Sequence, residues 1–163
     1  MSTAKEQLDF IDNLLEEYER KLGLPKIPEE LDNSQELEMY LTMDRKHVEA
    51  LSIEDCSYIC MRLAQFAIWI QRAQNREKSR VTWARNRINV ATADTLQSYK
   101  GYGREEKFWQ AVKGDDFASK VHKIQVYAEQ RAERLDFISN GLINLSKQIE
   151  SIKYNKLREE KDG

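Results

Sequence analysis

The sequence has few of the residues that usually carry catalysis, and this scarcity narrows the possible functions. Its 163 residues include two histidines, two cysteines, six glycines and two prolines. No glycine-rich run has the pattern of a phosphate-binding loop, and no pair of His, Cys or carboxylate side chains falls into an evident pocket. We therefore expect a protein that is not an enzyme, with no catalytic residue, no cofactor and no metal site.

Long hydrophobic segments are also missing. Uncharged stretches such as residues 63–71, nine residues in length, are far shorter than the ~20 apolar residues of a membrane-spanning helix. The first residues lack the apolar region of a secretory signal, and two cysteines make no disulfide framework. We expect a cytoplasmic protein without a membrane partner.

Charge is plentiful and unevenly distributed. The whole chain has a formal net charge of −2, from 26 basic and 28 acidic residues. Residues 1–55 contain 6 bases and 15 acids, a net charge of −9, so the remaining 20 bases and 13 acids give +7. This asymmetry indicates anionic partners, charge pairing between subunits, or both. The plainer alternative is that charged helices simply need solvated faces.

Helix-start and helix-stop residues divide the chain. Thr3 and Glu6 have the spacing of a capping box, which predicts the start of a first helix, and Gly23 predicts its end. Asn33 predicts the start of a short, weak helix that reaches about Ala50. We interpret residues 1–50 as an acidic N-terminal helical arm.

Two long amphipathic helices are predicted in the remaining chain, residues 51–163. Ser52 is the expected start of a helix over residues 53–98, and a second long helix is expected over 115–158. A short helix over 104–113 lies between them. The second long helix repeats apolar residues at steps of 4 and 3 for about five heptads, which is typical of a coiled coil. The sequence predicts an all-α fold, a long antiparallel helical hairpin with coiled-coil heptads.

The predicted length of these helices favours self-association. Helices of 46 and 44 residues are roughly 65–70 Å long, and two such rods enclose little interior. We therefore expect a homo-oligomer. The side chains predicted to form its interface are Val121, Ile124, Leu135, Ile138, Leu142, Leu145, Ile149 and Ile152.

Each long apolar seam contains one charged residue. Glu77 interrupts the seam of the first long helix and Arg131 interrupts that of the second. In an antiparallel hairpin turning over residues 99–114, the positions of these residues differ by about five residues, or roughly 7–8 Å. Because an arginine side chain covers most of that distance, we predict that Glu77 and Arg131 pair. The alternative is that both lie where the seam opens to solvent.

A basic stripe is the one pattern with chemical content. Residues 72–87 contain six bases and one acid. Four arginines and two tryptophans, over residues 69–87, follow one another at steps of 3 or 4 residues along one helix face, and this face is the basic stripe. Arginines bind phosphates, and tryptophans stack on unpaired bases. The predicted nucleic-acid-binding residues are Trp69, Arg72, Arg76, Lys78, Arg80, Trp83, Arg85 and Arg87. The alternative is a solvated helix with both tryptophans in a subunit interface.

Cysteine and histidine give weaker patterns. Cys56 and Cys60 are one helical turn apart and could provide half of a metal site with His47 as a third ligand, but no fourth ligand is evident. Two small apolar side chains on a buried face are the better interpretation. His122 lies between basic residues and is interpreted as a surface side chain.

A basic helix ends in Tyr99-Lys-Gly-Tyr-Gly and is followed by an amphipathic helix rich in Leu and Ile over residues 135–152. In these features the region from Tyr58 to Tyr127 and the helix after it resemble the UvsY-like recombination mediators of tailed phages. The resemblance covers about residues 58–158. The longer acidic arm, and the Arg and Trp in place of mainly Lys, depart from the family pattern.

The resemblance implies a function. Such mediators form rings of helical subunits, bind single-stranded DNA and help a recombinase displace a single-strand-binding protein, in the host cytoplasm. It implies that the basic helix would contact DNA and that the 117–152 heptads would drive assembly. We expect a single-stranded-DNA-binding accessory protein. The alternative is a phage structural or scaffolding coiled-coil protein with no nucleic-acid role.

Overall fold

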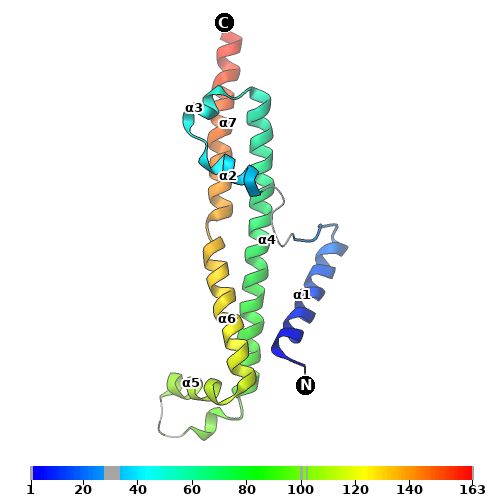
Figure 1. Ribbon diagram of the computed structural model, residues 1–163, viewed down its shortest axis with the longest axis vertical. Helices are drawn as coiled ribbons and strands as arrows, with labels where there is room; N and C mark the ends of the chain where they lie inside the picture. Colours follow the sequence, from blue (N-terminus) through cyan, green and yellow to red (C-terminus); the bar gives the residue numbers. More distant parts are fainter. Residues whose placement is uncertain (1, 28–33, 100, 102, 163) are drawn as a thin grey trace. The chain divides into compact units, whose positions relative to one another are not determined.

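The computed structural model describes residues 2–27, 34–99, 101 and 103–162, and all regular structure within them is helical (Figure 1). The elements in chain order are α1 (Ala4–Lys21), α2 (Ser34–Thr42), α3 (Arg45–Ala50), α4 (Ile53–Thr92), the 3₁₀ helix η1 (Leu96–Ser98), α5 (Arg104–Gly114), α6 (Asp116–Leu135) and α7 (Ile138–Asp162). The predicted all-α fold is confirmed, with α4 packed antiparallel to α6 and to α7.

The chain forms two compact units. The first unit contains Met1–Lys26 and Gln74–Arg134, and the second contains Ile27–Ala73 and Leu135–Gly163. This grouping differs from the expected division at residue 50, because α1 belongs with the second half of α4 while α2 and α3 belong with its first half.

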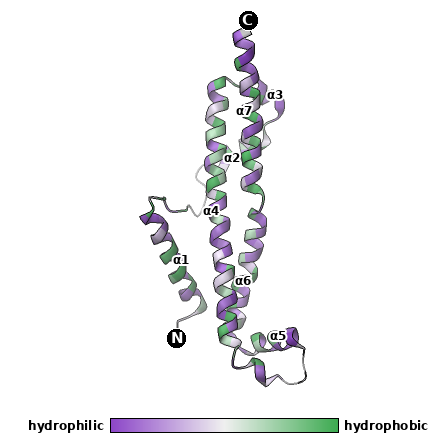
Figure 2. Cartoon of the chain, turned by 180° about the vertical axis from the view of Figure 1, so that it is seen from behind, coloured by the Kyte–Doolittle hydropathy of each residue, from purple (hydrophilic) through white to green (hydrophobic). Residues whose placement is uncertain are grey.

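The second unit has a core of larger aliphatic side chains. Leu63 and Phe66 of α4 pack there with Leu142 and Ile149 of α7, all at most 2% exposed. Tyr40, from α2, closes the same core. Hydrophobic and hydrophilic residues alternate along these helices, as expected for amphipathic helices with one buried face (Figure 2).

The first unit has a core of smaller side chains. Ala84 and Ile88 of α4 pack with Ala118 and Val121 of α6, all at most 1% exposed. Ala4, at the start of α1, joins this core. Small residues let the helix backbones approach closely. The buried Ala4 holds the N-terminal turn of α1 in the first unit, in addition to the ion pairs between α1 and α4.

The predicted starts of the first helix and the long helix are confirmed. The Glu6 backbone N–H donates to Thr3 Oγ1 over 3.2 Å, and the Thr3 N–H donates to Glu6 Oε2 over 2.8 Å, which is a complete capping box. At the start of α4, the Asp55 N–H donates to Ser52 Oγ over 3.0 Å. Asn33, the predicted start of the next helix, lies outside the described residues.

The predicted helix up to residue 50 is wrong in one respect, because it is divided. Asp44 has extended backbone and its side chain accepts a hydrogen bond from the His47 N–H over 2.8 Å. Asp44 therefore caps a new helix, α3, instead of continuing α2.

The predicted end of the long helix at Ser98 is also wrong, because α4 ends at Thr92. The hydroxyls of Thr92, Thr95 and Ser98 donate to the carbonyls of Ile88, Thr92 and Thr95, respectively. Such local hydrogen bonds offer the backbone an alternative to the helix, and the chain continues as the short 3₁₀ helix η1.

The expected continuous helix over 115–158 is interrupted between α6 and α7. Phe137 adopts a left-handed backbone with φ of 62°, and its side chain is 76% exposed. After this break Ser139 is buried, with its hydroxyl 3.0 Å from Gln71 Oε1, while Ile138 is 39% exposed. At the start of α7 the buried position therefore moves from Ile138 to Ser139, whereas Leu142 and Ile149 remain buried as the heptads predict.

The residues predicted to form the oligomer interface are mostly covered within the chain itself. Val121, Leu142 and Ile149 are at most 2% exposed in the two cores. Those partly buried are Ile124, Leu135, Leu145 and Ile152. A second copy is therefore not required to bury this seam, and self-association stays a prediction. Among the described residues, no helix is both long and apolar enough to cross a membrane.

Candidate nucleic-acid interface

Helix α4 places one part of the predicted basic stripe within the first unit. Arg76, Arg80, Trp83 and Arg87 follow one another at steps of 4, 3 and 4 residues, so they share one flank of the helix. Trp83 is partly buried against the small-residue core, whereas Arg87 is exposed. The stripe thus lies directly beside the buried face of α4.

Two carboxylates of α1 form ion pairs with two arginines of this stripe. Arg80 donates from Nη2 over 2.7 Å and from Nε over 3.0 Å to Asp12 Oδ2. Arg76 Nη1 lies 3.4 Å from Glu16 Oε1. Between 15% and 27% of each of these four side chains is exposed. These are partly buried ion pairs, and each arginine is largely withdrawn from solvent.

The residue numbers give the register of α1 on α4. Both ion pairs sum to 92, since 12 + 80 and 16 + 76 are equal. Ala4 and Ile88, which share the core of the first unit, have the same sum. The two helices are therefore antiparallel, with carboxylates one turn apart on α1 facing arginines one turn apart on α4.

Glu77 connects the stripe to α6. Its Oε1 accepts a hydrogen bond from Arg80 Nη1 over 2.8 Å, and its Oε2 lies 2.9 Å from Arg131 Nη2. The second contact is an ion pair by distance but lacks the angle of a hydrogen bond. The predicted pairing of Glu77 with Arg131 is confirmed, and the Glu77 side chain, 10% exposed, is not open to solvent.

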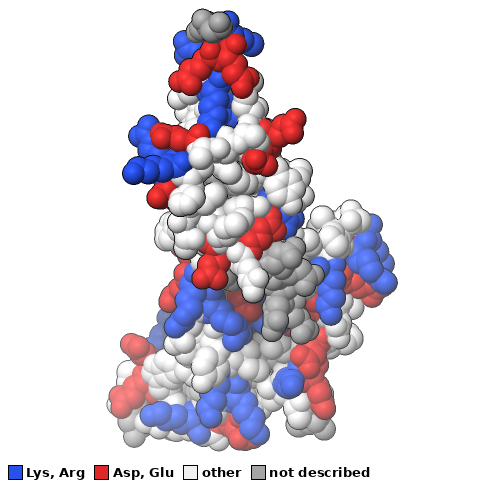
Figure 3. Space-filling view, turned by 45° about the horizontal axis from the view of Figure 1, so that its top comes forward, with Lys and Arg blue, Asp and Glu red and all other residues white. Residues whose placement is uncertain are grey.

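The network balances its charges. Asp12 and Glu77 provide two anions, and Arg80 and Arg131 provide two cations. Burial alone would lower the pKa of the Arg80 guanidinium, but the hydrogen bond to Asp12 and the charge of Glu77 raise that pKa overall. Arg80 therefore stays charged, as a buried cation with two hydrogen-bonded anions should. On the face drawn in Figure 3, acidic and basic side chains lie intermixed.

Two predicted residues belong to the second unit. The Arg72 guanidinium carbon lies 5.0 Å from the centre of the Trp69 ring, so a cation already covers one face of that indole. This arrangement makes Trp69 a support for Arg72 and leaves less of its ring available for stacking on a base.

The remaining predicted residues, Lys78 and Arg85, are exposed and lie on a different side of α4 from Arg80. Arg85 is 65% exposed in its side chain, and its Nη2 lies 3.9 Å from Glu129 Oε1, at the limit of an ion pair. Counted at 3.6 residues per turn, Arg85 lies roughly 140° around α4 from Arg80 and roughly 160° from Arg87. Lys78 is exposed as well. In the first unit, Arg76 and Arg80 are therefore paired with α1, whereas Lys78, Arg85 and Arg87 are exposed.

Sequence reasoning missed the acidic partners of the stripe. The uneven charge was noticed, but Asp12 and Glu16 were not identified. Their i,i+4 spacing equals that of Arg76 and Arg80, and this match was the available signal. Trp109 was also missed, and its ring lies 4.9 Å from that of His122, centre to centre.

The cysteine pattern is structural in this fold. Cys56 is fully buried, and Cys60 donates from Sγ to the Ser146 carbonyl over 3.2 Å. Burial raises the pKa of the Cys60 thiol, so it remains protonated. His47 instead pairs with Asp44, over 2.7 Å. Within the described ranges no group of three or more His, Cys, Asp or Glu could hold a metal ion.

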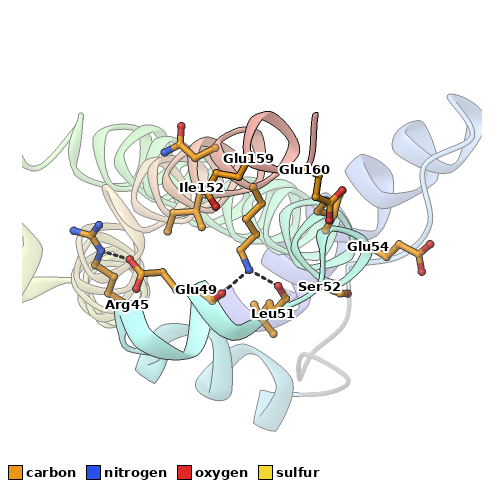
Figure 4. A pocket seen from close by; sticks show the side chains of 11 residues that line it. Arg45, Glu49, Leu51, Ser52, Glu54, Ile152, Glu159 and Glu160 are labelled. Atoms are coloured by element: carbon orange, nitrogen blue, oxygen red, sulfur yellow. Dashed lines mark hydrogen bonds and ion pairs between the residues drawn. The ribbon is translucent and has the colours of Figure 1, made fainter. Parts of the chain in front are cut away.

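An open groove of about 970 Å³ lies between α3, α7 and the start of α4 in the second unit (Figure 4). Lys156 donates from Nζ to the carbonyls of Glu49 and Leu51, just at the end of α3. A cation there satisfies carbonyls that the helix leaves without partners. The contacts of Lys156 in the groove are thus explained by helix capping. The residues that line the groove provide no second feature that indicates a ligand.

Comparisons of the chain with known proteins found no similar protein. No family model matches the chain, and no curated protein or solved structure matches it.

Proposed function

We propose that this chain is a single-stranded-DNA-binding accessory protein whose basic stripe binds phosphates after α1 moves away. The observation that carries the proposal is the match between α1 and the stripe, in which Asp12 and Glu16 neutralise Arg80 and Arg76. The same proposal includes what the UvsY-like resemblance implies, namely that the chain assembles into a ring and assists a recombinase.

The physical argument is an exchange of anions. Removing α1 without replacement would leave two partly buried arginines short of a counterion, which is unfavourable. A phosphate backbone supplies oxygens in place of the carboxylates, so the arginines stay paired in both states. Glu77 holds Arg80 through a separate hydrogen bond and keeps the guanidinium in position during the exchange.

The exposed apolar residues of α1 support a helix that can leave. Phe10 and Tyr18 are 63% and 61% exposed, although they belong to an amphipathic helix. Ala4 is the buried residue of α1. The docking of α1 therefore relies heavily on partly exposed ion pairs, which salt and competing polyanions weaken.

A structural or scaffolding coiled-coil protein with no nucleic-acid role is the second candidate. The same ion pairs favour it, because arginines that are already neutralised need no external anion. The two functions differ in one measurable property, the binding of single strands and its dependence on salt.

The test is fluorescence anisotropy of a labelled single-stranded oligonucleotide titrated with the full chain between 20 and about 300 mM salt. Each neutralised phosphate contributes about −0.7 to the slope of log K against log salt. Changing Arg76 and Arg80 together to Ala should weaken binding and reduce the slope by roughly 1–2.

The matched control is the double change of Lys120 and Lys123 to Ala, which removes the same charge from exposed positions on α6. Equal weakening by both double variants would reject the stripe as the site. An absence of binding even at the lowest salt would favour the scaffolding alternative.

A further inference from the structure

The first unit contains a pocket that the basic stripe does not use. It lies where α4, α5 and α6 meet and has a volume of about 330 Å³. The side chains that matter for its chemistry are Arg85, Asn89, Phe108, Trp109, His122 and Gln125. It is thus lined by aromatic rings, two amides and one guanidinium, drawn from three separate helices.

The aromatic side chains are held in place by one another. The Trp109 ring lies 5.4 Å from that of Phe108 and 4.9 Å from that of His122, in both cases edge to face. Trp109 is 37% exposed. An indole fixed on two sides and partly open to solvent offers a flat surface with little loss of side-chain freedom on binding.

The polar side chains at the pocket have unused hydrogen-bonding capacity. Gln125 donates from Nε2 to Glu129 over 2.9 Å, so its carbonyl oxygen remains an acceptor. Asn89 is exposed and its side chain makes no hydrogen bond within the described part of the chain. Arg85 is held by Glu129 only at 3.9 Å. A ligand phosphate can therefore compete with this carboxylate for the guanidinium.

We propose that this pocket binds an unpaired nucleobase together with its phosphate. Trp109 stacks on the base, the amides of Asn89 and Gln125 face the edge of the base, and Arg85 binds the phosphate. Stacking and edge recognition of this kind are how proteins recognise unpaired nucleotides. A volume of about 330 Å³ is near the lower end of ligand pockets, which suits one base.

The position of the pocket separates it from the arm. Because Arg85 lies roughly 140° around α4 from Arg80, the carboxylates of α1 do not cover it. The pocket is therefore accessible while α1 is paired with Arg76 and Arg80. This inference deepens the proposed function and rests on it for the source of the ligand, which is either a DNA strand or a free nucleotide.

The test uses the full chain and the indole N–H signals of its three tryptophans in heteronuclear NMR spectra. The probes are deoxyadenosine monophosphate, adenosine without the phosphate, and deoxyribose 5-phosphate without the base. We expect the Trp109 signal to move with the first two probes and to stay unchanged with the third. An equal response to deoxyribose phosphate, or no response of Trp109 to the monophosphate up to millimolar concentration, would overturn the proposal.

Two variants test the separate roles. Trp109→Leu should weaken binding of the monophosphate about fivefold or more, whereas Tyr127→Leu, at an exposed position of α6 outside the pocket, should leave it unchanged. Trp109→Leu is informative only if it retains its helical circular dichroism. Arg85→Gln changes an exposed side chain and keeps the test valid in either case. It should weaken monophosphate binding about three- to tenfold and leave adenosine binding unchanged, and equal losses for both ligands would contradict the assignment.

An oligonucleotide distinguishes failure of this inference from failure of the proposed function. A strand that binds the chain without moving the Trp109 signal would refute the pocket and leave the function standing. A monophosphate that binds while no oligonucleotide does would refute the DNA-binding function and identify a free nucleotide as the ligand.

Discussion

Glu77 Oε2 of α4 lies 2.9 Å from Arg131 Nη2 of α6, in the one place where each apolar seam contains a charge. The two side chains differ in environment, since that of Glu77 is 10% exposed and that of Arg131 is 49% exposed. Glu77 is the more demanding partner, because an unpaired carboxylate at this depth is costly. The pair thus favours one antiparallel register of α4 and α6.

A double-mutant cycle should detect this pair. Glu77→Gln and Arg131→Met should each destabilise the chain, and their effects should be non-additive by about 0.5–3 kcal/mol, because the residues touch. The measurement is urea unfolding followed by circular dichroism. Arg134→Met, one turn further along α6, is the matched control and should be additive with Glu77→Gln. Additive losses in both cycles would contradict a stabilising contact.

The core of the second unit should respond very differently at two neighbouring seam positions. Leu142 is 2% exposed and Ile138 is 39% exposed, although the uninterrupted heptads predict the same burial for both. Leu142→Ala should lower the free energy of unfolding by about 2–5 kcal/mol through the cavity it creates. Ile138→Ala should lower it by less than about 1 kcal/mol. Similar losses at both positions would show that Ile138 is buried in an assembly.

The break between α6 and α7 makes a backbone prediction. Phe137 has a left-handed backbone, with φ of 62°, and this conformation is unfavourable for residues with a Cβ atom. Phe137→Gly should therefore be more stable than Phe137→Ala by about 1 kcal/mol, because the two variants remove the same exposed ring and differ in backbone freedom. Thermal unfolding of the two variants provides the comparison. Greater stability of the alanine variant would show that the helix is continuous here.

The second unit has an ion pair that should make its stability depend on pH. Arg62 donates to Glu36 from Nε and Nη2, each over 2.9 Å, and the Tyr40 hydroxyl donates to the same carboxylate over 2.5 Å. The hydrogen bond from Arg62, and then that from Tyr40, lower the pKa of Glu36 below its ordinary value of 4.5. A lowered pKa in the folded state means that this contribution is fully present above pH 4.5 and is lost as the pH falls through the folded value.

Glu36→Gln should therefore destabilise the chain at neutral pH, and the difference from the wild type should shrink as the pH falls below about 4. Urea unfolding between pH 3 and 7 measures this difference. Glu38→Gln, at an exposed position of the same helix, should show no such trend. A constant difference for Glu36→Gln across the range would contradict the account.

Local chemistry in the sequence was sufficient for much of the fold. The capping box of Thr3 and Glu6 and the cap at Ser52 are short-range signals, and both helices begin where these residues predict. The heptad pattern predicted which faces of the long helices are buried. Glu77 and Arg131 could be paired from sequence because two antiparallel helices have a register that simple addition gives.

The errors arose where tertiary contacts or local hydrogen bonds compete with periodicity. No local signal marks the left-handed Phe137, since its conformation depends on which residues of α7 reach the core. The division at residue 50 follows composition, whereas the two units follow packing, which places α1 with the second half of α4. Composition also leaves open whether the acidic arm covers the stripe, although the spacing of Asp12 and Glu16 matches that of the arginines.

The central claim is that the α1 carboxylates occupy the arginines that would bind DNA, and one measurement tests it most directly. Asp12→Asn with Glu16→Gln removes both carboxylates that contact the stripe. Asp9→Asn with Glu17→Gln changes the net charge by the same amount at exposed positions of the same helix. The affinity of both variants and the wild type for one single-stranded oligonucleotide is measured at about 150 mM salt. The account predicts clearly tighter binding, by about tenfold or more, for the Asp12 and Glu16 variant and a much smaller gain for the control. Equal gains in the two variants, or no gain in either, would contradict it.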